Sequence, residues 1–173
     1  PVSYFKDISH GHFFYTPSKK GLGEIHKSEL KEMLTNWENV SKKEVLSWLD
    51  RFLQYNTFEI SIPALRDPGL APEGKTGLIV SLLMEYELFD KLKKSGWYEE
   101  FRKEIELRMI ALLSETVYPG LKDTIEKHFS ITPLSIEKRI RSAGGANVGW
   151  SFEAHIPVVH KLQIVSKSVM TPI

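Results

Sequence analysis

The apolar positions of the first half of the chain repeat at helical spacing in two places. Five of them predict a helix that begins near residue 25: Ile25, Leu30, Met33, Leu34 and Trp37. Ser41 and Glu44 have the spacing of a capping box, so they predict the start of a second helix. The apolar positions of that second helix are Val45, Trp48, Leu49, Phe52 and Leu53. Both stripes predict amphipathic helices that cover a core.

The longest helical stripe predicts a helix over residues 96–116. Its apolar positions fall on one side: Trp97, Phe101, Ile105, Met109, Leu112 and Leu113. The segment Tyr118-Pro119-Gly120 should end this helix, because proline lacks an N–H group and glycine reaches positive φ. A short helix is expected to follow over residues 121–128.

A threonine–proline pair predicts the start of the last helix. Thr132 can cap the N-terminus, and Pro133 suits the first helical position. This helix is expected to continue to about Arg141, where the glycine pair 144–145 stops it. Residues 147–153 then have a strand-like pattern.

Four short segments have the composition of β-strands. Residues 2–7 and 12–16 are rich in aromatic residues around a short turn, so they predict a hairpin. Residues 57–62 and 77–83 flank the proline- and glycine-rich stretch 67–74, which predicts a rigid, architectural connection between neighbouring strands. Strand pairs separated by helices predict an α+β fold, with a mixed and mostly antiparallel sheet and helices packed on one face.

Composition narrows the functional classes. The chain has 173 residues, 42% of them hydrophobic and 26% charged, as in ordinary globular domains. A net charge of +1 gives no electrostatic reason to expect a nucleic-acid partner. The absence of cysteine excludes disulfides and thiolate chemistry, and no apolar run is long enough to cross a bilayer. A chain that begins at Pro1 and ends on an apolar segment is expected to be one domain, residues 1–173, excised from a longer protein.

The candidate chemical groups do not form a complete active site by sequence alone. His10 and His12 lack further ligands at metal spacing, so we interpret them as surface residues and expect no metal site. There is no G-x-S-x-G motif for a serine hydrolase. The glycines Gly144, Gly145 and Gly149 lack the order of a phosphate-binding loop. They fit either a helix end that leads into a strand or a backbone that a flat ligand approaches closely.

Five segments occur in an order and spacing that one enzyme family shares. They are residues 62–75 (Ile-Pro-Ala-Leu-Arg-Asp-Pro-Gly-Leu-Ala-Pro-Glu-Gly-Lys), 118–121 (Tyr-Pro-Gly-Leu), 131–134 (Ile-Thr-Pro-Leu), 144–150 (Gly-Gly-Ala-Asn-Val-Gly-Trp) and 170–173 (Met-Thr-Pro-Ile). Together they resemble the FAD-dependent amine-oxidoreductase superfamily, and within it the phytoene-desaturase-like branch of carotenoid desaturases, carotenoid isomerases and retinol saturases. The resemblance covers about residues 56–173.

The resemblance implies that the chain is the substrate-binding domain of a two-part flavoenzyme. The parent's Rossmann-type domain would hold FAD, and the sheet of this chain would form one wall of a tunnel for a lipophilic polyene or isoprenoid substrate. The reaction would be hydride transfer to or from the flavin. Gly144, Gly145 and Gly149 are expected near the flavin, and Trp150 beside the substrate; no catalytic residue is assigned. Because the dinucleotide fingerprint is absent, this chain alone is not expected to bind FAD or turn over substrate.

The expected partners are the missing FAD-binding domain of the same chain and a lipophilic small molecule. The parent is expected in the cytoplasm, with peripheral membrane contact as a second option, and its oligomeric state, substrate and reaction direction stay open. Two other classes also stay open: a stand-alone module that binds a hydrophobic small molecule, and an interaction or dimerisation domain that uses the Trp/Leu face of residues 41–53. An excised domain should expose a large apolar patch where the missing domain docks.

Overall fold

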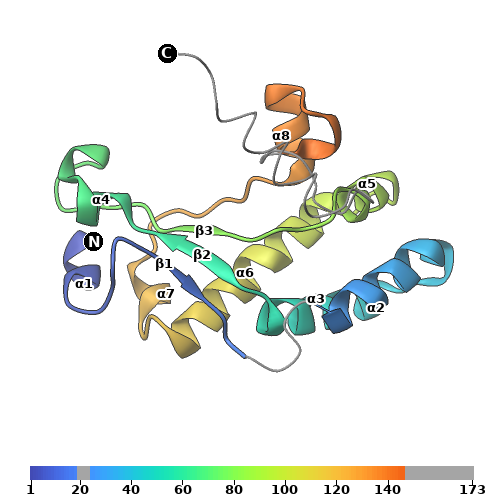
Figure 1. Cartoon of the computed structure of the whole chain (residues 1–173), viewed down its shortest axis with the longest axis horizontal. Helices are drawn as coiled ribbons and strands as arrows, with labels where there is room; N and C mark the ends of the chain where they lie inside the picture. The colour runs from blue at the N-terminus through green and yellow to red at the C-terminus, as the bar shows by residue number, and fades with distance from the viewer. Residues whose placement is uncertain (19–23, 147–173) are drawn as a thin grey trace, which may run out of the picture.

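The computed structural model describes residues 1–18 and 24–146 and confirms the α+β class. In that part of the chain three antiparallel strands form one sheet in the order β1-β2-β3 (Figure 1). The strands are β1 (His12–Tyr15), β2 (Phe58–Ser61) and β3 (Ile79–Ser81). The α-helices are α1 (Val2–Lys6), α2 (Glu24–Thr35), α3 (Lys42–Tyr55), α4 (Pro63–Arg66), α5 (Tyr86–Lys94), α6 (Tyr98–Thr116), α7 (Leu121–Thr124) and α8 (Pro133–Ile140). Short 3-10 turns are η1 (Trp37–Asn39), η2 (Pro68–Leu70) and η3 (Ala143–Gly145).

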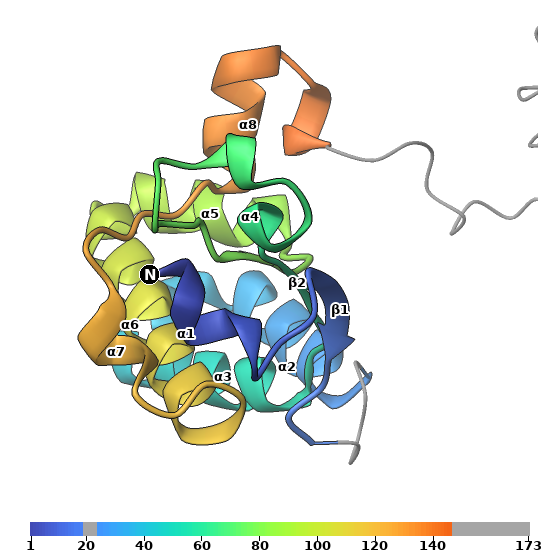
Figure 2. The same ribbon diagram turned by 90° about the vertical axis from the view of Figure 1, so that its left-hand side faces the viewer.

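The sheet has an inner face that helices cover and an outer face that they do not. Figure 2 shows α2, α3 and α6 on one side of β1 and β2. Side chains alternate between the faces along each strand, and the register aligns the alternation across all three strands. The inner sheet face consists of Phe13, Tyr15, Phe58, Ile60 and Val80. The outer sheet face consists of His12, Phe14, Glu59, Ser61, Ile79 and Ser81.

The core lies between the inner sheet face and helices α3, α5 and α6. Its largest fully buried side chains are Trp48, Tyr118, Phe58, Phe89, Phe101, Leu49, Ile60, Ile62, Leu88, Leu92 and Val45. Val45, Trp48 and Leu49 of α3 belong to this set, and Phe52 and Leu53 are buried as well, so the apolar face of α3 packs inside the molecule. The interaction or dimerisation hypothesis therefore loses the surface on which it was based.

Local sequence signals set the ends of two helices as predicted. Ser41 accepts a hydrogen bond from the Glu44 N–H, and the Glu44 carboxylate accepts one from the Ser41 N–H, which completes the capping box of α3. Thr132 accepts from the Ser135 N–H at the start of α8, with Pro133 in the first turn. The strand at 57–62 and the helix at 96–116 are also confirmed, with slightly shorter limits, and the strand at 77–83 is confirmed over Ile79–Ser81 alone.

The N-terminal prediction was wrong. Residues 2–7 form α1 instead of a strand, and β1 pairs with β2 instead of forming a hairpin with the residues before it. The Phe5 ring packs edge-on against Tyr118 at 5.2 Å between centroids, and the Tyr4 hydroxyl donates to the carbonyl of Pro119. These tertiary contacts outweigh the β-propensity of the aromatic residues.

Three helix predictions need smaller corrections. Helix α5 was not predicted, although Leu88, Phe89 and Leu92 are buried at helical spacing. Helix α7 ends at Thr124 instead of residue 128, because the chain continues in extended form toward α8. Helix α8 ends at Ile140 through Arg141, whose φ of 59° is left-handed, so the glycine pair lies beyond the helix end. None of the described helices is both long and apolar enough to span a bilayer.

Candidate functional site

The outer sheet face is the best candidate for a functional surface. Its residues form two rows across the sheet: His12, Ser61 and Ile79 in one, and Phe14, Glu59 and Ser81 in the other. Within the described ranges no helix lies over these rows (Figure 2). A regular, uncovered surface of this kind can contact a ligand or another domain without rearrangement.

Polar groups occupy the middle of the outer sheet face. The His12 Nε2–H donates to Glu59 Oε1 at 2.9 Å, diagonally across β1 and β2. Arg66 Nη2 donates to Ser61 Oγ at 3.1 Å from the end of α4. The Arg66 stem lies on the backbone of Gly11, where a Cβ atom would be only 2.5 Å from Arg66 Cγ. Two strands, one turn and one short helix therefore hold this network in place.

Apolar side chains flank that network. Phe14 is 68% exposed on β1, and its ring contacts the His12 ring at 5.6 Å between centroids. Ile79 on β3 is 51% exposed, and Leu83, just beyond β3, is 81% exposed. On this face the exposed apolar side chains stand at the sides and are separated by polar groups, so they do not form the large continuous patch that was expected.

Two of the glycines predicted to lie near the flavin, Gly144 and Gly145, follow the C-terminal end of α8. Gly145 is buried, and a Cβ atom there would be 2.2 Å from the Pro133 carbonyl oxygen, so the close approach that this glycine permits is to the protein's own backbone. Gly144 has a φ of 63° and no atom within 4 Å of its Cβ position. The assignment of both to a flavin neighbourhood stays a prediction. Gly149 and Trp150 lie outside the described residues.

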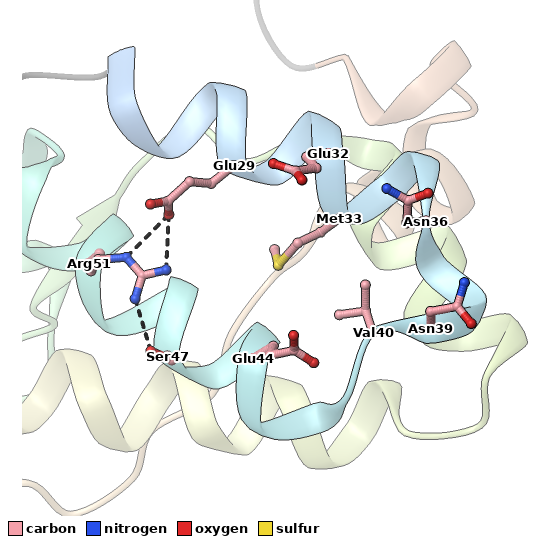
Figure 3. Close-up of a pocket in the computed structure, with 9 residues that line it drawn as sticks. All are labelled: Glu29, Glu32, Met33, Asn36, Asn39, Val40, Glu44, Ser47 and Arg51. Atoms are coloured by element: carbon pink, nitrogen blue, oxygen red, sulfur yellow. Dashed lines mark hydrogen bonds and ion pairs between the residues drawn. The ribbon is translucent and has the colours of Figure 1, made fainter.

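A hollow of about 420 Å³ lies between α2 and α3 (Figure 3). Arg51 points across it and donates from Nε and Nη2 to Glu29 Oε2, at 3.2 and 3.0 Å, and from Nη1 to Ser47 Oγ at 2.9 Å. Glu32 and Met33 also line it. Because its carboxylates and its guanidinium group make it polar, it does not suit a lipophilic ligand.

A nearly buried carboxylate joins α6 to the extended segment before α8. Glu106 is 10% exposed and accepts hydrogen bonds from His128 Nδ1 at 2.8 Å and Ser130 Oγ at 2.6 Å. Burial raises the pKa of Glu106, but the Ser130 and His128 hydrogen bonds, with the nearby charges of His128 and Arg102, outweigh it and lower the pKa below the ordinary value. Both donors point at the carboxylate, not at each other, so this is a structural clamp and not a nucleophile–base pair.

The sequence did not predict the polar network of the outer sheet face or the hydrogen bonds of Glu106, because the residues of each come from separate elements. The one available signal was His12, which was interpreted as a surface residue, and its exposed position on the sheet confirms that interpretation. Among the described residues no group of histidine, aspartate and glutamate could hold a metal ion.

Comparisons with known proteins give a distant relationship. No protein-family model and no solved structure match the chain. Prolycopene isomerase 1 and prolycopene isomerase 2, both chloroplastic and from an Oncidium hybrid cultivar, are 32% identical to it over 79 residues. Those residues are 46% of this chain and 13% of each relative's length. The chain is thus distantly similar to carotenoid-isomerase-like proteins, over a small part of their length.

Proposed function

We propose that this chain belongs to a flavin-dependent oxidoreductase of the carotenoid desaturase and isomerase type, and that its outer sheet face is one wall of the substrate site. The observation that carries the proposal is the similarity to the two prolycopene isomerases, which agrees with the family resemblance of residues 56–173. The uncovered outer sheet face, with Phe14 and Ile79 at its sides, supports a role in contact with a lipophilic molecule.

The described residues do not by themselves fit FAD. A dinucleotide site needs parallel strands joined through a glycine-rich turn and a helix, whereas all strand pairs in the described part are antiparallel. In the proposal, FAD is therefore held by a further domain of the same protein, and Gly144, Gly145, Gly149 and Trp150 lie at the boundary with it. The substrate is a polyene or related lipid, and a cytoplasmic location stays part of the proposal.

The cofactor part of the proposal is tested by comparing this chain with the complete protein to which it belongs. We expect the purified complete protein to be yellow, with flavin absorbance, and this chain to be colourless while folded. A complete protein that is folded but colourless, and that gains no colour on incubation with FAD, would overturn the proposal.

The substrate part is tested by changing the outer sheet face in the complete protein, with prolycopene as the probe. Phe14→Asp combined with Ile79→Asp should abolish isomerisation, because two carboxylates on this wall would have to be desolvated by the polyene. Leu107→Asp, on the exposed side of α6, is the matched control and should keep both flavin and activity. Full activity in the double variant would show that this face does not contact the substrate.

A further inference from the structure

Arg66 of α4 lies beside the outer sheet face and contacts Ser61 and Gly11, but it has no acidic partner among the described residues. Of the residues that the structure describes, none with a carboxylate pairs with its guanidinium group. The neighbouring acid in the sequence, Asp67, accepts instead from the Gly69 N–H at 2.9 Å and so is used inside its own loop. Glu59, the acid of the same face, is hydrogen bonded to His12.

Two contacts hold the Arg66 side chain in one orientation. The stem of Arg66 lies against Gly11, so close that a Cβ atom at Gly11 would be 2.5 Å from Cγ and 3.0 Å from Cδ. At the other end Nη2 donates to Ser61 Oγ. An exposed arginine without a ligand usually keeps its rotamer freedom, and holding it costs conformational entropy. Here two contacts restrict the side chain in advance, which reduces the entropy cost of binding an anion.

The donors that remain at this point suit an oxyanion. Arg66 uses one of its five N–H groups on Ser61, so the others are available in a planar fork that matches a carboxylate or a phosphate. Ser61 accepts from Arg66, so its own O–H can donate to the same anion. His12 lies opposite Ser61 on the neighbouring strand β1, in the same row of the face.

We propose that Arg66 and Ser61, flanked by His12, form a binding site for a carboxylate or phosphate oxyanion at the end of an amphipathic lipid. The apolar body of that ligand lies along Ile79, which is next to Ser61 in the same row. This second statement rests on the proposed function, because it takes the outer sheet face as a wall that contacts lipids, and it adds amphipathic lipids to the hydrocarbons that the wall can contact. A pure hydrocarbon such as prolycopene can contact only the apolar side chains of this wall, whereas an amphipathic lipid also gains hydrogen bonds from Arg66 and Ser61.

The test measures binding to this chain, without flavin, by isothermal titration with three probes: dodecanoate, dodecanol and inorganic phosphate. Dodecanoate should bind at least about tenfold more tightly than dodecanol, because only the carboxylate gains charge-assisted hydrogen bonds. Phosphate that binds and displaces dodecanoate supports the oxyanion site for a free anion, whereas dodecanoate binding without phosphate binding supports the lipid carboxylate. Equal affinity for dodecanoate and dodecanol, or no binding of either anion, would overturn the proposal.

Variants locate the site. Arg66→Gln should reduce dodecanoate affinity about tenfold and bring it to that of dodecanol. Gly11→Ala keeps the charge but forces the Arg66 stem to move, so it should weaken binding as well. Arg139→Gln, which removes an exposed arginine of α8, is the control and should bind like the unchanged chain. If Arg66→Gln binds dodecanoate normally, the site is wrong; because no step of this test uses flavin, that result would leave the proposed function itself standing.

Discussion

The two faces of the sheet alternate along the same three strands, yet they have different relations to the rest of the molecule. On the inner face Phe58 and Ile60 are fully buried under α3, α5 and α6. On the outer face Phe14 and Ile79 are more than half exposed and stand beside a carboxylate and an imidazole. The inner face therefore forms part of the core that specifies the fold, whereas the outer face is not covered by the described helices.

The largest expected effect comes from truncating one phenylalanine on each face. Phe58→Ala should lower the free energy of unfolding by about 3–5 kcal/mol, because it leaves a cavity in the core. Phe14→Ala should change it by less than about 0.5 kcal/mol, since the ring is mostly in water. Urea denaturation of both variants measures the difference. Similar losses at the two positions would mean that the faces are not energetically distinct.

A smaller effect is expected from the two histidine–glutamate pairs, one nearly buried and one on the outer sheet face. Glu106→Gln should cost about 1–3 kcal/mol at neutral pH, because the carboxylate accepts two hydrogen bonds with little access to water. Glu59→Gln, at a carboxylate that is half exposed, should cost less than about 0.5 kcal/mol.

Acidification tests the charged state of the Glu106 carboxylate. The folded-state pKa of Glu106 is lowered, so its stabilising contribution is complete above the ordinary value of 4.5 and disappears as the pH falls through the lower folded value. The gap in unfolding free energy between Glu106→Gln and the unchanged chain should therefore close on acidification below 4.5. A gap that is constant with pH would contradict the charged state assigned to this carboxylate.

The smallest effect on stability is expected from removing both apolar side chains of the outer face. Phe14→Ser combined with Ile79→Ser should shift the unfolding free energy by no more than about 0.5 kcal/mol, while reducing the fluorescence of a bound hydrophobic dye. A loss of about 2 kcal/mol or more in unfolding free energy would show that another part of the chain covers the outer face in solution. The two faces would then not differ in exposure.

Elements with local signals could be predicted from the sequence, and those fixed at long range could not. The Ser41–Glu44 box and the Thr132–Pro133 start depend on residues within one helical turn, so their spacing was sufficient. Helix α1 depends on Tyr118, more than a hundred positions away, and no pattern within residues 2–7 contains that contact. Its aromatic residues therefore predicted the wrong element.

The contrast between local signals and long-range contacts also applies to the candidate site on the outer sheet face. The composition of residues 57–62 predicted a strand, and the structure places Glu59 and Ser61 of that strand on one face. The position of Arg66 over Gly11 depends on how α4 leaves β2 and on the register of β1, and neither is encoded by spacing. The glycines that attracted attention in the sequence instead mark the compact turn after α8.

The pairing of β1 with β2 also has a consequence for the order of folding. The hydroxyl groups of Thr16 and Thr57, hydrogen bonded at 2.8 Å beyond the ends of these strands, are 41 positions apart, and α2 and α3 lie between them. Bringing such distant segments together has an entropic cost that is reduced when the intervening chain is already compact. We therefore expect α2 and α3 to form and associate first, and the strands to pair late. The surface assigned to ligand binding would then be among the last parts of the molecule to exist.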